Sequence, residues 1–503
     1  MGLAELCEVV LHPKSGKEWE DANKAAFEAL FGAPGGRYPD AARHKVWPRA
    51  PGAKGVDAED FGRGKSPEFV SFAAYTEHGE PKSGAYGGMS IAIFPPAEGN
   101  GPCLITMVVG TNGLAPDEYI LGGAGHSRKF KAICAWLNAE VGHGTQVAWA
   151  KQDPTRVDDK LPTGVRDAFP KHSPAIDRYG RWMYAAFCPT GDASETKRAL
   201  AAFLDVMFEE RGIAPLTSEK KNADEIREKW LQFMMPTVTK DYVKKLLQTR
   251  KYVVLQGPPG TGKTRLAGQI LREDYQGRGM SVQFHPSTTY ESFVGGLAPV
   301  ATSDSLGLRF EPTCGTLMRA AEEARKDSRP YLLHVDEINR ADLSKVLGEA
   351  IMLLEPHSVD QRKVIMAHDF GKPFGREFSL PENLHIVGTM NSADRSIAIL
   401  DIAVRRRFAF VSMWPEMAVV QECGCQMMID AYRRLVDIFI ESANEESFGM
   451  VPGHSYFLET DESKAPMSLK TNLKPLLEEY LAQGYVSGFA ESIRAYIQYL
   501  NSL

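Results

Sequence analysis

The sequence has 503 residues, of which 43% are hydrophobic and 24% are charged, and its formal net charge is -6. This length is too great for one ordinary core, and at about 150 residues per domain it predicts roughly two to four domains. The composition favours neither a disordered nor a fibrous class, and the charge gives no overall basic surface for nucleic acid. DNA binding would therefore need a local patch or an assembly of subunits.

The first residues and the cysteines favour a cytoplasmic protein. The first residues include acidic side chains and lack an uninterrupted apolar run, so they do not read as a signal peptide, and no stretch reaches the roughly 18 apolar residues of a membrane span. The seven cysteines are scattered and odd in number, which argues against a disulfide framework. Cys423 and Cys425 form the only close pair, without further metal ligands at matching spacing, so we interpret them as reduced thiols on a helix.

Up to about residue 215, segments rich in Gly and Pro separate short apolar runs. Residues 89–94 and 103–109 read as neighbouring strands joined by a Gly-rich turn, whereas residues 130–140 and 196–212 carry apolar side chains at helical spacing. We therefore predict a mixed α/β N-terminal domain over residues 1–220. The polar segment TSEKKNADEIREKW then indicates a linker that runs into a helix, which places a domain boundary near residue 220.

After this boundary, apolar strands alternate with amphipathic helices as far as about residue 414. Such alternation is typical of a parallel sheet covered by helices, so we predict an α/β core over residues 221–414. Helical periodicity dominates the rest of the chain and predicts a small helical lid domain over residues 415–503.

A glycine-rich segment, GPPGTGKT, follows the first strand of this core and opens a helix. It fits the pattern G-x-x-x-x-G-K-[ST], in which backbone N–H groups and the positive end of the helix cradle phosphates. Lys263 would reach the β and γ phosphates, and the hydroxyl of Thr264 would bind Mg²⁺. The predicted nucleotide-binding loop comprises Gly257, Pro258, Pro259, Gly260, Thr261, Gly262, Lys263 and Thr264.

Polar residues follow two later strands of the core. The segment YLLHVDE delivers Asp336 and Glu337 to the carboxyl end of the sheet, where ligands bind in open α/β folds. Asp336 would hold Mg²⁺ together with Thr264, and Glu337 would polarise the attacking water. The segment LHIVGTMN ends in Asn391, which would orient water beside the γ phosphate, although a turn is also a common place for asparagine.

Three consecutive arginines, Arg405 to Arg407, stand at the end of a short predicted helix in AVRRRF. They can complement the helix dipole. An arginine on a subunit surface can also neutralise transition-state charge in a neighbouring subunit's site, and this effect is large in phosphoryl transfer.

Taken together, residues 225–485 resemble the AAA+ motor subunit of McrBC-type modification-dependent restriction systems, the McrB-like family. The likeness rests on the glycine loop and on VQFHPSTTYESFVGG, HVDEINRADLSKVLGEAIMLLE, GTMNSADRSIAILDIAVRRRFAF and VPGHSYFL, in that order. The resemblance implies an AAA+ P-loop NTPase that uses GTP and Mg²⁺, assembles as a hexameric ring and is stimulated by a McrC-like nuclease subunit.

Carried over to this sequence, the resemblance makes Asn339 the signature polar residue beside the acidic pair, Asn391 the sensor and Arg406 the finger that acts in trans. The choice of GTP over ATP rests on the resemblance alone, because the sequence lacks an NKxD-type guanine motif. His454, in GHSYF, reads equally well as a nucleotide contact or as a packed or capping histidine. We place no sensor-2 arginine.

In McrB-like proteins the N-terminal position usually holds a domain that reads modified DNA, by base flipping in some cases. Aromatic and basic residues mingle in GHSRKFKAICAW and IDRYGRWMYAAF, although such aromatic residues more often belong to a core. We expect a motor, without its own nuclease, that couples recognition of modified or foreign DNA to the partner nuclease. The alternatives are a MoxR-like ATP-driven chaperone and a passive DNA binder, and the intact Lys263, Asp336, Glu337 and Asn391 argue against the latter.

Overall fold

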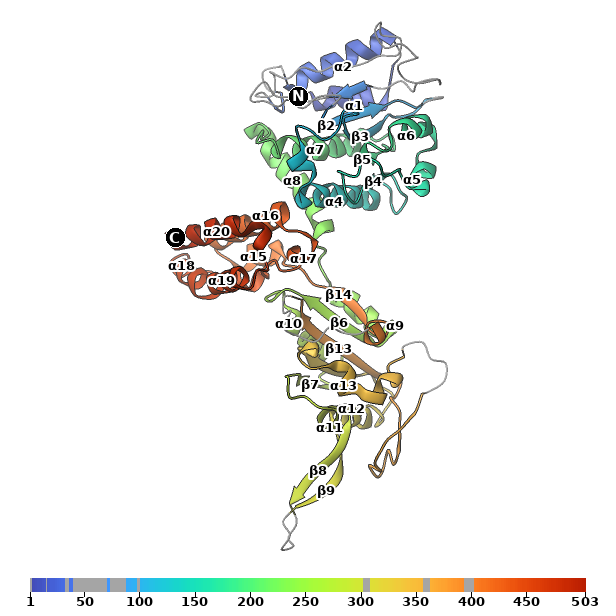
Figure 1. The fold of residues 1–503 in the computed structure, drawn as a ribbon, viewed down its shortest axis with the longest axis vertical. Helices are drawn as coiled ribbons and strands as arrows, with labels where there is room; N and C mark the ends of the chain where they lie inside the picture. The colour runs from blue at the N-terminus through green and yellow to red at the C-terminus, as the bar shows by residue number, and fades with distance from the viewer. Residues whose placement is uncertain are drawn as a thin grey trace. The chain divides into compact units, whose positions relative to one another are not determined.

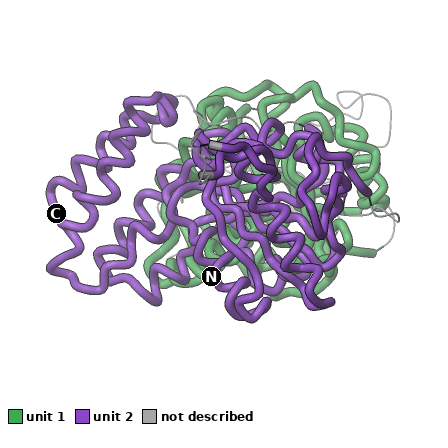
Figure 2. Tube along the Cα trace, turned by 90° about the horizontal axis from the view of Figure 1, so that it is seen from below, with its two compact units in different colours: residues 1–234, 440–444 green, residues 235–439, 445–503 purple. Residues whose placement is uncertain are grey.

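The structure is a computed structural model that describes residues 2–14, 16–31, 36–38, 70–72, 87–96, 100–301, 308–355, 362–392 and 402–503. It divides into two units, one formed by residues 1–234 and 440–444 and the other by residues 235–439 and 445–503 (Figures 1 and 2). Within the described ranges, the helices are too short or too polar to cross a membrane.

An antiparallel five-stranded sheet with the order β1-β2-β3-β5-β4 forms the centre of unit 1. The predicted neighbouring strands are confirmed as β2 and β3, whose register pairs Ile91 with Met107 and Ile93 with Ile105. The strands are β1 (Val70–Phe72), β2 (Met89–Phe94), β3 (Leu104–Val109), β4 (Ala148–Ala150) and β5 (Met183–Phe187).

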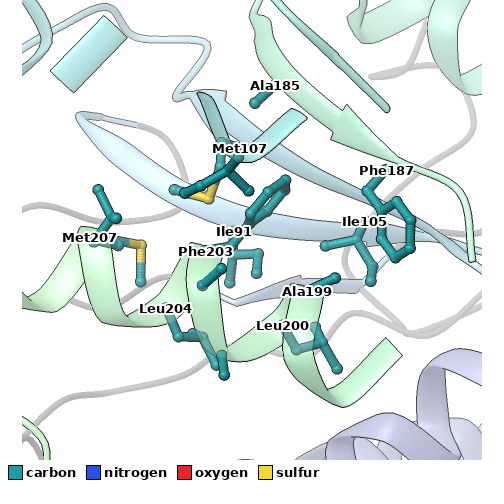
Figure 3. Close-up of a cluster of buried hydrophobic side chains, with 14 of the residues drawn as sticks. Ile91, Ile105, Met107, Ala185, Phe187, Ala199, Leu200, Phe203, Leu204 and Met207 are labelled. Atoms are coloured by element: carbon teal, nitrogen blue, oxygen red, sulfur yellow. The ribbon is translucent and has the colours of Figure 1, made fainter. Parts of the chain in front are cut away.

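Side chains of β2 alternate between two cores, one on each face of this sheet. Ile91 packs with Leu200 and Phe203 of the helix α7 (Ala193–Glu209; Figure 3). Ala92 and Phe94, on the other face, belong to a second cluster with residues of α5 (Thr163–Ala168) and α6 (Ser173–Tyr179). Because both faces are covered, the strands read as continuous apolar runs. The helices of this unit are α1 (Leu3–Leu11), α2 (Gly16–Phe31), α3 (Glu118–Leu121), α4 (Ala124–Glu140), α5 (Thr163–Ala168), η2 (Pro170–His172), α6 (Ser173–Tyr179), α7 (Ala193–Glu209) and α8 (Thr217–Met234).

The polar segment near residue 220 is part of the helix α8, and unit 1 continues to Met234. Ile226 and Trp230 of α8 are 4% and 3% exposed and join the main core of unit 1. A division of the chain at residue 220 therefore falls inside a packed helix.

Unit 2 contains a parallel five-stranded sheet with the order β14-β6-β13-β10-β7, which confirms the predicted α/β class. Its strands are β6 (Tyr252–Gly257), β7 (Gly279–Gln283), β10 (Tyr331–Asp336), β13 (Leu384–Asn391) and β14 (Ala409–Ser412). Unit 2 also contains two separate antiparallel strand pairs, β8 (Gly295–Ala301) with β9 (Leu308–Cys314), and β11 (Val364–Ile365) with β12 (Glu377–Phe378). Because β13 lies between β6 and β10, the carboxyl ends of these three strands are neighbours.

Helices before β14 accompany this sheet, and helices dominate the chain after it. The first group is α9 (Lys240–Arg250), α10 (Lys263–Glu273), α11 (Tyr290–Phe293), α12 (Thr316–Ala324), η3 (Ile338–Arg340), α13 (Leu343–Leu347), η4 (Gly348–Leu353) and α14 (Ile402–Arg405). The second group is α15 (Met417–Cys423), α16 (Gln426–Ser442), α17 (Glu445–Phe448), η5 (His454–Phe457), α18 (Ala465–Ser468), η6 (Leu469–Leu473), α19 (Lys474–Ala482), η7 (Ser487–Phe489) and α20 (Ala490–Ser502).

Cys423 and Cys425 are both free thiols. Cys423 is the last residue of α15, whereas Cys425 lies just before α16. The expectation that both thiols lie on a helix is therefore correct for Cys423 alone.

Candidate active site

The glycine loop connects β6 to α10, as its sequence predicts. Gly260 and Gly262 have φ values of +83° and +80°, in the left-handed region that side chains disfavour. Gly262 is the N-cap of α10, which begins at Lys263. The loop therefore turns into the N-terminus of a helix, where backbone N–H groups and the helix dipole favour an anion.

The Lys263 side chain lies against the loop itself. It is 7% exposed, and its Nζ donates to the carbonyl oxygens of Gly257 at 3.0 Å and Pro258 at 2.7 Å. Burial lowers the pKa of Lys263 to about 8, although the carboxylates of Glu337 and Asp336 act in the opposite direction. Because burial removes hydration from the charged ammonium group, an ion pair with a phosphate would stabilise that charge strongly.

Hydroxyl groups from two other elements converge on Asp336 at the end of β10. The hydroxyl of Thr264, in α10, donates to Asp336 Oδ1 at 2.9 Å, and the hydroxyl of Thr389, in β13, donates to the same oxygen. Hydroxyl and carboxylate oxygens are hard ligands that suit Mg²⁺, which is commonly held by one or two carboxylates together with substrate phosphates. The described residues contain no group of three or more His, Cys, Asp or Glu side chains that could hold a metal alone.

Glu337 has a strained backbone conformation, and Asn391 holds its carboxylate. Its φ of 52° is left-handed, which is uncommon for a residue other than glycine. Asn391 donates its side-chain N–H to Glu337 Oε1 at 2.7 Å, and Asn339 donates to the carbonyl oxygen of Asn391 at 3.3 Å. These three residues, predicted from two separate motifs, are therefore brought together at the carboxyl ends of β10 and β13.

The GHSYF segment pairs with the glycine loop through the backbone. The N–H of Gly453 donates to Pro259 O at 2.9 Å, and the N–H of Ser455 donates to Gly260 O at 3.0 Å. Sequence reasoning singled out this segment but missed the pairing, because the two stretches lie far apart in the chain.

His454 is a packed residue that also lies beside the loop. It is 7% exposed, and its Nδ1 accepts from the N–H of Glu416 at 3.2 Å, so the neutral ring carries its proton on Nε2. Burial, and secondarily Arg265, lowers the pKa of His454, which favours this neutral form. A Cβ built on Gly262 would stand 3.6 Å from Nε2. His454 is therefore a packed residue that accepts the backbone N–H of Glu416, and its Nε2 lies near the glycine loop.

The three arginines at the end of α14 have different surroundings. Arg407 is 5% exposed and donates to Ala403 O at 2.8 Å, and the guanidinium of Arg405 stacks on Phe410 at 5.4 Å. Arg406 is exposed, and no ion pair joins its side chain to another described residue. Most of the SADRSIAILD part of the preceding motif lies outside the described residues.

In unit 1, four of the aromatic residues that mingle with basic residues belong to the core: Phe130, Trp136, Tyr184 and Phe187. Trp136 and Tyr184 are 0% and 1% exposed within the main cluster. Trp182 is half-buried, and the guanidinium of Arg181 lies 4.4 Å from its ring centroid. This stacked, partly accessible pair is a candidate surface contact for a base or a charged ligand.

Comparisons with known proteins match parts of the chain. A family model described as an AAA domain of the dynein-related subfamily matches residues 252–408. The Type IV methyl-directed restriction enzyme EcoKMcrB subunit of Escherichia coli is 35% identical over 269 residues, which cover 49% of this chain and 57% of that protein. The Type II restriction enzyme BsuMI component YdiS of Bacillus subtilis is 28% identical over 190 residues, which cover 31% of this chain and 55% of that protein.

A solved structure of a RuvB mutant from Thermotoga maritima aligns with a TM-score of 0.23 and 16% identity, over 52% of this chain and 71% of that one. This chain spans little more than half the length of the two restriction proteins. The matched region contains the glycine loop, the acidic pair and Asn391, the same residues that converge in the structure. Residues 252–408 are therefore an AAA domain, and about half of the chain is similar to the McrB subunit of a restriction enzyme.

Proposed function

We propose that this chain is a GTP-hydrolysing motor that couples recognition of DNA by unit 1 to a separate nuclease subunit in the restriction of modified or foreign DNA. The contact between Asn391 and Glu337, next to the Asp336–Thr264 pair and the glycine loop, carries the proposal. It sets a carboxylate and a water-orienting amide beside a phosphate site, as NTP hydrolysis requires.

Each residue of the site then has a distinct task. The loop from Gly257 to Thr264 binds the phosphates through its backbone N–H groups, and Lys263 supplies the positive charge. Thr264 and Asp336 would hold Mg²⁺, which neutralises charge on the phosphates when it is bound. Because Thr264 already donates to Asp336 at 2.9 Å, the two ligands need little rearrangement.

Glu337 acts on the attacking water. Its carboxylate accepts a proton as the water oxygen bonds to the γ phosphorus and the bond from that phosphorus to the bridging oxygen breaks. Asn339 donates to the backbone carbonyl oxygen of Asn391 and so holds this residue in place. The side chain of Asn391 then positions both the Glu337 carboxylate and the water. Arg406 completes the site of the next subunit in a hexameric ring, because it is the exposed arginine of the three that has no aromatic partner among the described residues.

The relatives support the biological part of the proposal. One is named as a subunit of a methyl-directed restriction enzyme and the other as a component of a restriction enzyme, which favours DNA as the target and a McrC-like nuclease as the partner. The half-buried Trp182 with Arg181 in unit 1 offers a place for a stacked base.

The test combines turnover with DNA binding. The purified chain should hydrolyse GTP faster than ATP in the presence of Mg²⁺, and residues 1–234 should bind DNA with an affinity that falls steeply as salt increases. Faster ATP turnover without DNA binding by the full chain would contradict the proposal and favour the MoxR-like chaperone.

A further inference from the structure

Thr389 is a polar residue in the middle of the parallel sheet. It lies in β13, between β6 and β10, and is 2% exposed. The residues before it in this strand are apolar or glycine except for His385. A buried hydroxyl needs partners, because leaving it without them costs its lost hydration.

The hydroxyl of Thr389 has two partners, and both belong to the acidic pair. It donates its hydrogen to Asp336 Oδ1, and its oxygen accepts the backbone N–H of Glu337 at 3.2 Å. A hydroxyl has one hydrogen to donate, so these bonds fix both its donor and an acceptor position. The Thr389 side chain thus links the carboxylate of Asp336, a proposed Mg²⁺ ligand, to the backbone of Glu337, the proposed base.

The backbone of Glu337 needs such support. Its φ and ψ of 52° and 47° are left-handed, a conformation that persists where surrounding contacts hold it. The neighbouring Gly388 makes room for this turn, since a Cβ there would stand 2.9 Å from Ile338 Cδ1. From the other side, Asn391 holds the carboxylate of Glu337. Gly388, Thr389 and Asn391 of β13 therefore all contribute to the position of Asp336 and Glu337.

We propose that Thr389 is a positioning residue for nucleotide hydrolysis. It sets the orientation of the Asp336 carboxylate toward Mg²⁺ and aims Glu337 at the attacking water. The inference rests on the proposed hydrolysis and adds a residue that acts through Asp336 and Glu337 without touching the nucleotide. A threonine that only fills space in the core would need its volume and not its hydroxyl.

Two substitutions separate the hydroxyl from the volume. Thr389→Val keeps the shape and removes the hydroxyl, whereas Thr389→Ser keeps the hydroxyl and removes a methyl group. Thr316→Val is the matched control, because Thr316 is also buried and its hydroxyl accepts from Arg319 in α12, away from the site. Each full-length variant is compared with the wild type for thermal unfolding, GTP turnover and affinity for a non-hydrolysable GTP analogue at increasing Mg²⁺.

Loss of a partner that orients a metal ligand typically lowers metal affinity or activity by about 10- to 100-fold. Thr389→Val should therefore show a fall of this size in turnover, and analogue binding should need about tenfold more Mg²⁺, while affinity measured in EDTA stays unchanged. Thr389→Ser should restore both properties despite lower thermal stability, and Thr316→Val should match the wild type in both.

Wild-type turnover and Mg²⁺ requirement in Thr389→Val would overturn the role of Thr389, as would a loss in Thr389→Ser equal to that in Thr389→Val. A wild-type chain that binds the analogue with Mg²⁺ but hydrolyses neither GTP nor ATP would contradict the proposed function instead. The shift in Mg²⁺ requirement would still decide whether Thr389 orients Asp336.

Discussion

The side-chain amide of Asn391 donates to Glu337 Oε1 at 2.7 Å, which joins the last residue of β13 to the residue after β10. In parallel strands that lie side by side, both residues reach the same edge of the sheet. Glu337, the proposed base, thus contacts Asn391, the residue that would orient it. It also makes Glu337 the first residue to test.

Replacing Glu337 with Gln should remove the proton acceptor while preserving the shape and the hydrogen bond from Asn391. We expect nucleotide binding within about twofold of the wild type and turnover lower by about 10² or more, as is typical when a general base is lost. Glu382→Gln is the matched control, because Glu382 is exposed and precedes β13 at the opposite end of the strand. Near-normal turnover of Glu337→Gln would exclude Glu337 as the base.

The depressed pKa of Lys263 predicts a pH-dependent nucleotide affinity. Burial lowers this pKa to about 8 in the free protein, so the charged fraction of Lys263 falls as pH rises through that value. Because phosphates favour the charged form, binding above about pH 8 should take up a proton, and affinity should fall by up to about tenfold per pH unit. Calorimetry of ATP or GTP binding in buffers of different ionisation enthalpy, between about pH 7 and about pH 9, measures both effects. A flat affinity without proton uptake would contradict the assignment.

The close approach of Gly453 to the glycine loop predicts a steric test of the GHSYF segment. A Cβ on Gly453 would stand 2.0 Å from the carbonyl carbon of Gly260, so Gly453→Ala must displace one of the two segments. We expect nucleotide affinity to fall by about tenfold or more and stability to fall by about 1–3 kcal/mol, as overpacking usually causes. Gly449→Ala is the control, because its Cβ would stand 3.4 Å from Glu446 O. Unchanged nucleotide affinity in Gly453→Ala would separate this segment from nucleotide binding.

Arg406 tests whether the site is completed by a neighbouring subunit. Arg406→Ala should fold and bind nucleotide but hydrolyse it roughly 10³-fold more slowly, because a transition-state cation is lost. The exposed Arg329, which pairs with Asp327, provides the control Arg329→Ala. Mixing Arg406→Ala with Lys263→Ala subunits should restore partial activity, since some interfaces then combine an intact loop with an intact finger. Normal turnover of Arg406→Ala would remove it from this role, and mixtures that stay inactive would indicate a structural role.

The helix α8 predicts a difference between two fragments of unit 1. Residues 1–234 keep Ile226 and Trp230 in the main core, whereas residues 1–220 lose both. Since removing one buried large side chain costs about 3–5 kcal/mol, we expect the shorter fragment to be less stable by at least this amount or unfolded. Neither fragment contains residues 440–444, so urea unfolding of the two isolates the effect of α8. Equal midpoints would show that α8 is dispensable.

Several features of this protein could be predicted from local sequence alone. The glycine loop needs residues that tolerate positive φ and a lysine at the start of a helix, and the acidic pair must follow an apolar strand. These requirements act over a few neighbouring residues, so GPPGTGKT and YLLHVDE identify both features. The alternation of strand and helix likewise predicts a parallel sheet, because buried strands and amphipathic helices have different periodicities.

Other features depended on tertiary structure, because they join residues that are distant in the chain. The apolar strand LHIVGTMN gives no sign that Thr389 bonds to both Asp336 and Glu337, which follows from the placement of β13 beside β10. The sequence shows three consecutive arginines without a difference between them, whereas in the structure Arg407 is buried and Arg406 is exposed. The polar segment around residue 220 resembles a linker, yet two apolar side chains four residues apart, Ile226 and Trp230, are enough to pack it as a helix once a core is present to receive them.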